Sequence, residues 1–214
     1  MSKTIISPHP FQWKSQEALV DYPYALQWMD SRVKAIQTGE GPECAWFVEH
    51  PPLYTMGTSG QEKDILNSKK YPVFKTGRGG QVTYHGPGQR VVYLMLDLNL
   101  CYHDIRRYVR ELEEWLIQTL DHLGIKGERR EGRVGIWVQK EGKDHKIAAL
   151  GVRVQKWVTS HGIALNINPD LKPYQDIIPC GLKDYGVTSL ADLGLKVTLQ
   201  EVDEILRKTF PFSQ

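Results

Sequence analysis

Cys180 stands in the surroundings that best suit a nucleophile among the three cysteines of the chain. It follows Ile177-Ile178-Pro179 and precedes Gly181, so a proline fixes the chain before it and a glycine leaves the sulfur side open. Attack requires a thiolate that the substrate can reach. Cys44 lies in an apolar stretch and Cys101 just before an expected helix, and both fit a buried small hydrophobe better. Taken alone, Cys180 could share that fate.

Lys146 and His161 each introduce a run of small residues. Lys146 leads into Ile147 to Gly151, and His161 leads into Gly162-Ile163-Ala164. A lysine drawn into a poorly solvated place either loses its proton easily or pairs with an acid. The alternative is a strand-edge charge whose ammonium reaches water. His161 fits either close packing of strands or the wall of a pocket.

A glycine-rich segment runs from Arg78 to Gln89 with the sequence RGGQVTYHGPGQ. Paired glycines let the backbone approach a ligand and offer its N–H groups without obstruction. Arg78, Thr83, His85 and Gln89 add polar groups, which favours a binding loop over a β-hairpin that needs glycine only for its turns. The segment matches neither of the glycine motifs that bind nucleotide phosphates.

The elements that must position these residues can be read from periodicity. Asp21-Tyr22-Pro23 predicts a helix start, and apolar residues at helical spacing continue to Ile36. The clearest helix is expected from about Asp104 to Leu123, with Gly124 as its stop. Thr198 to Glu201 has the spacing of a capping box and predicts a last helix.

Strands are expected in two groups, separated by the long helix. We predict strands over 44–48, 72–75, 90–98, 134–139, 146–155 and 158–167. Two prolines at 51 and 52 should end the first strand. We expect loops over 57–72 and in the glycine-rich segment, and a hairpin loop over 141–144. The chain from 168 to about 186 should be irregular. Strands that group together rather than alternating with helices favour an α+β fold in a single domain over residues 1–214.

Composition excludes several classes of function. A net charge of +2 is too small to suggest a nucleic-acid-binding protein. Three distant cysteines predict neither a disulfide framework nor a structural zinc site, so we expect no metal. No apolar run is long enough to span a bilayer, and the first residues lack the apolar core of a signal peptide. We expect a cytoplasmic protein whose thiols stay reduced, with no membrane partner.

Together these segments resemble a known family. The run Arg78 to Gln89 is similar to the signature of the octanoyl-carrier-protein:protein octanoyltransferases, the enzymes that begin lipoate biosynthesis on proteins. The resemblance continues, in the family's order, through Glu49 to Gly57, Lys146 to Gly151, His161 to Asn166, and Pro179 to Gly181. It spans about residues 20 to 190.

The resemblance implies a fold related to the catalytic domains of biotin and lipoate protein ligases, with a mixed sheet and flanking helices. It makes Cys180 the residue that takes the octanoyl group and Lys146 the residue that activates this cysteine. Three segments would bind the acyl group: Arg78, Gly79, Gly80, Gln81, Val82, Thr83, Tyr84 and His85; Ala149, Leu150 and Gly151; and Gly162, Ile163 and Ala164. Small walls at Ala148, Ala149 and Ala164 would set the depth of the acyl pocket.

The family's partners follow from the same resemblance. The donor would be acyl carrier protein, which holds the octanoyl group on its phosphopantetheine, so no separate cofactor is expected. The acceptors would be lysines of lipoyl domains and of the glycine cleavage H protein. We expect the chain to act as a monomer.

Three other functions remain open at this level. An ATP-dependent ligase of the same fold would need no nucleophilic cysteine. A Cys–His hydrolase would use His85 or His161 as its base and release free acid. A binding module for acidic carrier proteins would use a basic surface, although we expect that surface to be an ordinary solvated face; its residues are Arg106, Arg107, Arg110, Arg129, Arg130 and Lys156.

Overall fold

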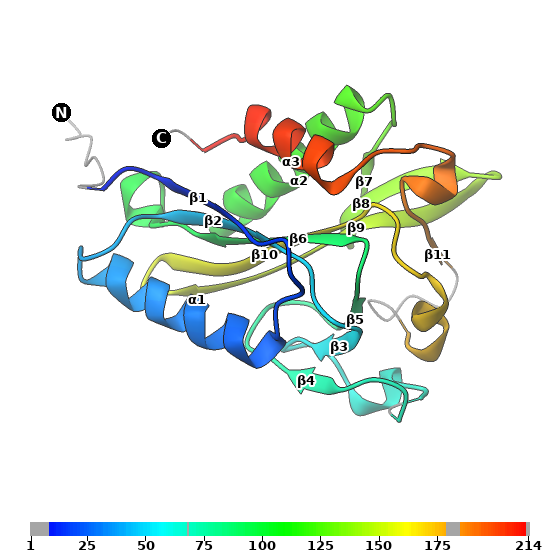
Figure 1. Ribbon diagram of the computed structural model, residues 1–214, viewed down its shortest axis with the longest axis horizontal. Helices are drawn as coiled ribbons and strands as arrows, with labels where there is room; N and C mark the ends of the chain where they lie inside the picture. The colour runs from blue at the N-terminus through cyan, green and yellow to red at the C-terminus, as the bar shows by residue number, and fades with distance from the viewer. Residues whose placement is uncertain (1–8, 68, 179–184, 213–214) are drawn as a thin grey trace.

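The computed structural model describes residues 9–67, 69–178 and 185–212. A large mixed sheet forms the middle layer, α1 covers one face, and α2 and α3 cover the other (Figure 1). The strand order is β1-β2-β6-β10-β9-β8-β7, with β11 added beside β9. A second sheet of three strands, in the order β4-β3-β5, lies on the α1 side. This is the expected α+β fold, with a mixed sheet and flanking helices.

The helices begin and end close to the predicted residues. They are α1 (Tyr22–Gln37), α2 (Ile105–His122) and α3 (Leu199–Lys208). Asp104 caps α2 by accepting a hydrogen bond from the backbone N–H of Arg107, and Thr198 and Glu201 form the predicted capping box of α3. Such caps satisfy N–H groups that have no partner inside the helix. The side chains therefore mark these helix starts in the sequence.

Within the described residues, six strands match the predicted ones and five were not predicted. The matching strands are β2 (Cys44–Val48), β4 (Val73–Lys75), β6 (Gln89–Met95), β8 (Arg133–Lys140), β9 (Lys143–Gln155) and β10 (Val158–Asn166). The others are β1 (Gln12–Ser15), β3 (Leu53–Met56), β5 (Val82–His85), β7 (Glu128–Arg130) and β11 (Gly186–Val187).

Two predictions about loops were therefore wrong. The prolines end β2, but β3 begins directly after them and pairs with β5, which lies inside the predicted glycine-rich loop. The loop between β8 and β9 is shorter than expected, because only Glu141 and Gly142 separate the two strands. The described part of 57–72 agrees with the predicted loop, and its one regular piece is a 3₁₀ turn, Glu62–Asp64.

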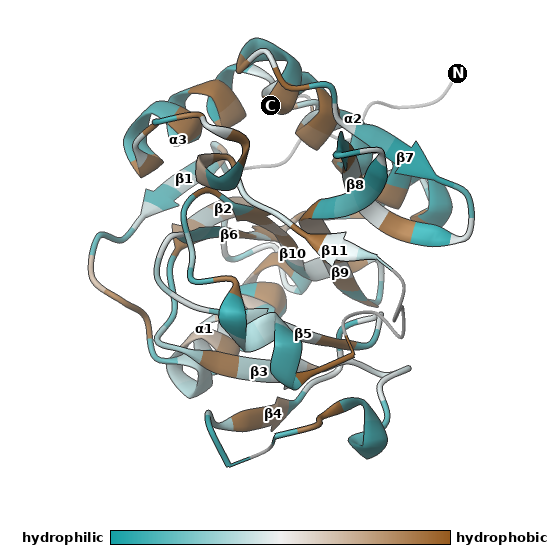
Figure 2. Ribbon diagram, turned by 90° about the vertical axis from the view of Figure 1, so that its right-hand side faces the viewer, coloured by the Kyte–Doolittle hydropathy of each residue, from teal (hydrophilic) through white to brown (hydrophobic). Residues whose placement is uncertain are grey.

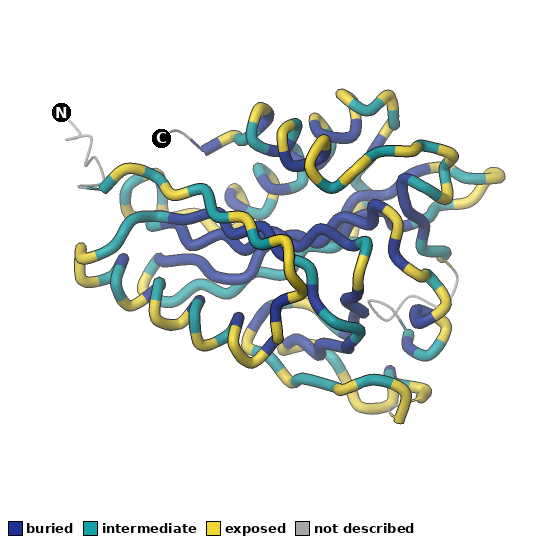
Figure 3. Tube along the Cα trace, in the orientation of Figure 1, coloured by how far each residue is buried: buried dark blue, intermediate teal, exposed yellow. Residues whose placement is uncertain are grey.

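The two faces of the large sheet carry separate apolar clusters. Side chains of α2 and α3 pack against Phe47, Leu94 and Leu165 on one face, whereas Met29 and Val33 of α1 pack against Trp46 and other side chains on the other face. The central strands are buried along their length (Figure 3), and apolar residues alternate between the two faces. Figure 2 shows the apolar sides of α2 and α3 turned towards the sheet. The α1 face also holds a cavity.

Candidate active site

A cavity of about 370 Å³ opens on the α1 side of the large sheet, between β6, β9, β10 and the segment that ends in β5. From the first predicted segment it is lined by Arg78, Gly80, Gln81, Val82, Thr83 and His85. From the other two it is lined by Ala149, Leu150, Gly151, Gly162, Ile163 and Ala164. Lys146 lines the same cavity. One space therefore brings together three segments that are distant in the sequence.

Two residues of the predicted segments do not line the cavity. The backbone N–H of Gly79 donates to the carbonyl of Val152 at 2.8 Å. This hydrogen bond attaches the turn at Gly79-Gly80, called the glycine turn below, to β9. Tyr84 packs instead with Tyr54 and Tyr174, in the small apolar cluster beneath β5. Cys180 lies outside the described residues.

The cavity also has walls that sequence reasoning missed. They are Tyr22, Ser59, Val91, Tyr93, Gly132, Arg133 and Val134. These residues come from α1, the loop after β3, β6 and the β7–β8 hairpin, outside any of the recognised motifs. The alternation of β6 was the available signal, because Val91 and Tyr93 face α1 while Val92 and Leu94 face α2.

A β-bulge turns Lys146 towards the cavity. Ile136 of β8 pairs with Ala148 of β9, and the next residue, Trp137, pairs with Lys146, so Ile147 is an extra residue in β9. Ile147 and Ala148 consequently both pack on the α2 face, and Ala149 lies on the cavity face. Without the extra residue, strict alternation would place Lys146 on the same face as Ala148. Bulges of this kind re-aim side chains beside active sites.

The same geometry corrects one expectation about the acyl pocket. Ala149 and Ala164 are neighbours across β9 and β10 and both line the cavity. Ala148 does not line it, because the bulge places this residue in the core beneath α2, where it is 1% exposed. Only two of the three predicted small walls thus face the space.

Lys146 is buried, with 7% of its surface exposed. Its ammonium donates a hydrogen bond to the carbonyl of Val134 at 2.9 Å and lies 4.8 Å from the centre of the Trp137 ring. A carbonyl oxygen and an aromatic face both favour a positive charge. Gly135 leaves room for this side chain, because a Cβ at that position would lie 3.3 Å from the Lys146 Nζ and 3.1 Å from its Cε.

Arg78 organises the glycine turn. Its Nη2 donates to the carbonyls of Thr55 and Gln81, each at 2.9 Å, and its Nη1 donates to the carbonyl of Gly79 at 2.9 Å. A guanidinium that is 8% exposed thus satisfies carbonyls of the turn and of β3 together. Gly57 must be glycine here, because a Cβ would lie 2.4 Å from the carbonyl oxygen of Gly80.

Three buried histidines, His50, His85 and His161, lie around Tyr93 and the end of β5, called the inner part of the site below. His50 Nδ1 donates to the carbonyl of Val20 and His50 Nε2 accepts from the Tyr93 hydroxyl, both at 2.6 Å. His85 Nδ1 lies 2.7 Å from Gln89 Oε1, and its Nε2 lies 3.2 Å from the hydroxyl of Thr55. Desolvation by burial lowers the pKa of His50 to about 4 and the pKa of His85 to about 3. Burial also lowers the pKa of His161 to about 3. All three imidazoles are therefore neutral near pH 7.

A buried polar chain links this inner part to the strand of Lys146. Gln89 Nε2 donates to Asn166 Oδ1 at 2.9 Å, and Asn166 Nδ2 donates to the carbonyl of Thr188 at 2.9 Å. The N–H of Thr188 in turn donates to the carbonyl of Lys146 at 3.0 Å. Because Val187 pairs with Lys146 in β11, the residues that follow 179–184 are tied to the strand that carries the lysine.

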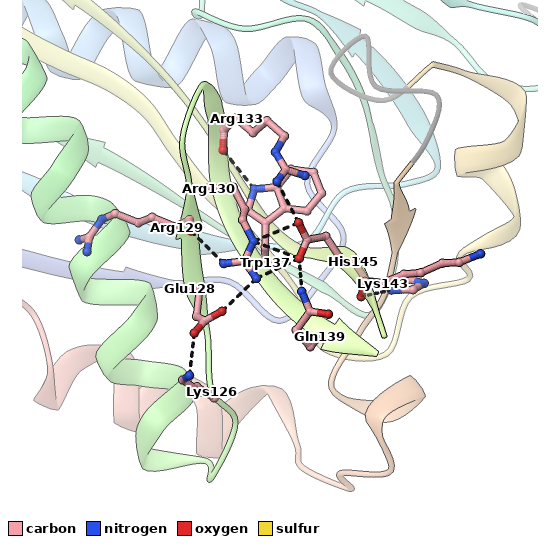
Figure 4. A network of polar contacts seen from close by, with 10 residues as sticks. Lys126, Glu128, Arg129, Arg130, Arg133, Trp137, Gln139, Lys143 and His145 are labelled. Carbon is pink, nitrogen blue, oxygen red and sulfur yellow. Dashed lines mark hydrogen bonds and ion pairs between the residues drawn. The ribbon is translucent and has the colours of Figure 1, made fainter. Parts of the chain in front are cut away.

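An ion-pair network supports the β7–β8–β9 edge beside the cavity (Figure 4). Asp144 pairs with Arg130 and with Arg133, each at 2.9 Å. The Arg133 guanidinium also lies 4.9 Å from the Trp137 ring and 4.2 Å from the Tyr185 ring. This network holds β8 in place, and with it the Trp137 ring that the Lys146 ammonium contacts.

The two other cysteines differ in their surroundings. Cys44 is fully buried in β2, and burial raises the pKa of its thiol to about 11, which fits the expected structural role. Cys101 is exposed, so the expectation that it would be buried was wrong. Among residues 9–67, 69–178 and 185–212, no cluster of three or more His, Cys, Asp or Glu could hold a metal ion. The described helices include none with the length and apolarity to cross a membrane.

Structural comparison shows the fold. A bipartite lipoate protein ligase from Thermoplasma acidophilum matches with a TM-score of 0.68 at 17% identity, over 94% of this chain and 83% of that chain. A lipoate-protein ligase A bound with ATP gives a TM-score of 0.68 at 18% identity, over 93% and 84%. The biotin protein ligase of Aquifex aeolicus gives 0.51 at 14% identity, over 93% and 66%. The expected relation to ligase catalytic domains is thus confirmed.

Sequence comparison shows the family. Residues 21–211 match the family described as the lipoyl protein ligase A/B catalytic domain. An octanoyltransferase of Paramagnetospirillum magneticum is 55% identical over 204 residues, which cover 95% of this chain and 96% of that protein. An octanoyltransferase of Brucella melitensis is 52% identical over 94% of this chain and 80% of its own length. The chain therefore belongs to the octanoyltransferases, within the lipoyl protein ligase A/B catalytic-domain family.

Proposed function

We propose that the chain transfers an octanoyl group from acyl carrier protein to a lysine of lipoyl domains and of the glycine cleavage H protein, through a thioester on Cys180. Identity of 52–56% to octanoyltransferases supports the reaction class. The observation that carries the proposal is the bulge in β9, which turns a buried lysine into an apolar cavity.

The first step is an exchange of thioesters. Lys146 holds the proton of the Cys180 thiol, and the thiolate attacks the carbonyl carbon of the carrier's thioester. The bond from that carbon to the carrier's sulfur breaks, and the phosphopantetheine thiolate leaves with the proton from Lys146. An ammonium beside the sulfur favours the thiolate, which the carbonyl of Val134 and the ring of Trp137 support by stabilising that ammonium. The proton belongs to the pair as a whole.

The second step forms the amide. The ε-amine of the acceptor lysine attacks the carbonyl carbon of the acyl-enzyme, and the bond to Cys180 Sγ breaks. The proton that the amine loses passes through Lys146 to the departing sulfur. An amide is more stable than a thioester, so this step runs downhill and needs no ATP.

The cavity suits an acyl chain. Ala149, Gly151, Gly162 and Ala164 leave space between β9 and β10 because none of them has a side chain larger than a methyl group. Each methylene buried there contributes about 0.8 kcal/mol. A hexanoyl group would therefore lose about 1.6 kcal/mol, or about fifteen-fold in affinity, relative to octanoyl.

The surroundings of the histidines weigh against a Cys–His hydrolase. A pKa of about 3 makes both His85 and His161 weak bases near pH 7. Both ring nitrogens of His85 are also engaged, by Gln89 and by Thr55. Lys146 lines the cavity and pairs with Val187 of β11.

The basic residues proposed for a binding module are partly engaged within the fold. Arg129 pairs with Glu113 and Glu114, and Arg130 pairs with Glu128 and Asp144. These contacts brace the edge of the sheet and favour a structural role for the two arginines.

The test is intact-mass analysis of the full chain mixed with octanoyl-loaded acyl carrier protein without ATP. We expect one octanoyl adduct that hydroxylamine removes and that an added lipoyl domain takes up. Cys180→Ser should abolish the adduct and Lys146→Ala should slow its formation by at least 100-fold. Cys101→Ser and Lys140→Ala serve as matched controls, because Cys101 is exposed and Lys140 pairs with Asp192 and does not line the cavity.

The result also separates the alternatives. Modification of the lipoyl domain from free octanoate and ATP, with no adduct from the carrier, would establish a ligase. Release of free octanoate without amide formation would establish a hydrolase. Binding of the carrier that Cys180→Ser leaves intact, with no turnover in the unaltered chain, would establish a binding module.

A further inference from the structure

His161 faces the cavity although its place in β10 assigns it to the opposite side of the sheet. Thr159, Ile163 and Leu165 all point towards α2, as the hydrogen bond from Tyr108 to Thr159 and the packing of the other two show. His161 belongs to the same alternating series. Its ring nevertheless lies edge-on against the ring of Tyr93, which faces α1, with the two ring centres 6.0 Å apart.

The backbone explains this reversal. His161 has φ of 60°, in the left-handed region that non-glycine residues seldom adopt. The other described non-glycine residues with positive φ are Glu141, Lys156 and Trp157, which lie in hairpin turns. A strained residue inside a buried strand persists only where the surrounding structure holds it, and such strain is concentrated at functional sites.

His161 also differs from the neighbouring imidazoles in its bonding. His50 and His85 each engage both ring nitrogens with protein groups. His161 makes no hydrogen bond to any residue of the described ranges, although it is only 4% exposed. A neutral imidazole carries one donor and one acceptor. The cavity is therefore the place where those two groups can find a partner.

The position of His161 along the cavity fits the far end of an eight-carbon chain. The Lys146 ammonium lies beside Gly135 of β8. The next residue of β8, Ile136, pairs with Ala148 of β9, so along β9 the ammonium lies at the position of Ala148 and Ala149. His161 is paired with Val152, three residues farther along β9, or about 10 Å at roughly 3.3 Å per residue. An extended chain advances about 3.5 Å per three bonds, so the seven C–C bonds of an octanoyl group span about 8 Å.

We propose that His161 is the specificity-determining residue that contacts the ω end of the acyl chain. This inference rests on the proposed function for the placement of the thioester beside Lys146. A decanoyl chain would press apolar carbons against the two ring nitrogens and remove their access to water, which is unfavourable. A hydroxyl group on the eighth carbon would instead find a hydrogen-bond partner. His161 therefore discriminates against longer apolar chains and tolerates a polar ω group.

The experiment compares octanoyl, decanoyl and 8-hydroxyoctanoyl groups on acyl carrier protein, with the full chain and a lipoyl domain. In the unaltered protein we expect kcat/KM for 8-hydroxyoctanoyl to lie within about threefold of octanoyl. His161→Gly accommodates the positive φ and removes the imidazole. It should raise the decanoyl-to-octanoyl ratio about tenfold and lower the 8-hydroxyoctanoyl-to-octanoyl ratio about tenfold, each shift being about 1.4 kcal/mol.

Opposite shifts of the two ratios separate recognition from a loss of structure, which would lower all three rates together. Glu141→Gly is the matched control, because it relieves a φ of 52° in an exposed turn and should change neither ratio. His161→Asn tolerates positive φ and keeps a donor and an acceptor, so its ratios should lie nearer to those of the unaltered protein.

Calorimetric binding of octanoic, decanoic and 8-hydroxyoctanoic acids measures the same preference without turnover. Unchanged ratios in His161→Gly, or a loss of more than 100-fold for the hydroxylated chain in the unaltered protein, would overturn the role of His161. Absence of transfer from every donor, together with the expected binding ratios, would overturn the proposed reaction and leave the assignment of His161 standing.

Discussion

The position of the Lys146 ammonium depends on a residue with no side chain. Gly135 has φ of 121°, and a Cβ there would lie 2.8 Å from the carbonyl oxygen of Ala148 and 3.1 Å from the Lys146 Cε. The glycine therefore provides the space in which the lysine reaches the carbonyl of Val134. A methyl group would displace the ammonium from the wall of the cavity.

Gly135→Ala should consequently lower kcat for octanoyl transfer by about 100-fold or more, because the proposed mechanism requires Lys146 at the reacting sulfur and a displacement near 1 Å is costly for such a group. The measurement is the rate of acyl-enzyme formation by intact mass. Gly142→Ala is the control, since Gly142 also has a positive φ, 74°, but no atom lies within 4 Å of the added carbon. Equal losses in both variants would mean that backbone strain, rather than the lysine, is responsible.

The three neutral histidines also make stability depend on pH. Their folded-state pKa values of about 4, 3 and 3 lie below the unfolded value of about 6.5, so the unfolded chain binds more protons below pH 6.5. The free energy of unfolding should therefore fall as the pH decreases from about 6.5 towards 4, by up to about 1.4 kcal/mol per pH unit for each histidine. Urea unfolding at several pH values measures this slope. His161→Asn should reduce it by about one histidine's share, and an unchanged slope would show that His161 is already protonated in the folded state.

At the scale of elements, two interruptions of regular strands build the cavity wall. The extra residue in β9 reverses the facing of Lys146, and the left-handed residue in β10 reverses the facing of His161. Between them the ladder from Ala148 to Gly151 is regular and pairs with 162–165. Each strand thus supplies small residues to the wall from its regular part and a polar group from its irregular part.

This facing predicts opposite effects for one substitution at two alanines that are close in the sheet. Ala164→Leu adds its side chain to the cavity, so it should lower kcat/KM for octanoyl more than tenfold and affect hexanoyl less. Ala148→Leu adds the same atoms to the packed core beneath α2 and should lower the free energy of unfolding by about 1–3 kcal/mol. Thermal unfolding and transfer rates with both donors check the pair. Similar chain-length profiles for the two variants would contradict the assignment of faces.

Periodicity predicted the elements that are stabilised locally and missed those that depend on distant partners. Asp104 and Thr198 cap their own helices, so α2 and α3 were readable from sequence. β3 and β5 have four residues each and depend on pairing with each other across 25 intervening residues, which no local pattern encodes. The family's motifs located the cavity segments. They could not give the facing of Ala148, because the bulge beside it arises from pairing with β8.

Across the whole molecule, the two faces of the large sheet are covered differently. α2 and α3 cover a face that is packed with apolar side chains, and α1 together with the small sheet surrounds the face that holds the cavity (Figure 1). Trp115 of α2 donates its indole N–H to the carbonyl of Leu206 in α3 at 2.8 Å, which ties the two helices together. The larger apolar cluster and the cavity thus lie on opposite sides of the sheet.

Leu206→Ala should therefore lower the free energy of unfolding by about 2–5 kcal/mol, because its buried side chain lies in the α2–α3 layer. At temperatures where the variant stays folded, KM for octanoyl-loaded carrier should remain within about twofold of the unaltered protein. Urea titration and steady-state kinetics on the same samples test both statements. A large rise in KM without loss of stability would show that the two faces are coupled.

The two cations on Trp137 give the protein an optical probe of its own chemistry. The Lys146 ammonium and the Arg133 guanidinium lie 4.8 and 4.9 Å from the ring, so a change in the charge of Lys146 alters the electric field across the indole. That change shifts the emission wavelength of one tryptophan out of six, which subtraction of a Trp137→Phe spectrum isolates. Stopped-flow fluorescence would then measure the rate at which Lys146 gains or loses its proton. Mass analysis follows the acyl group separately.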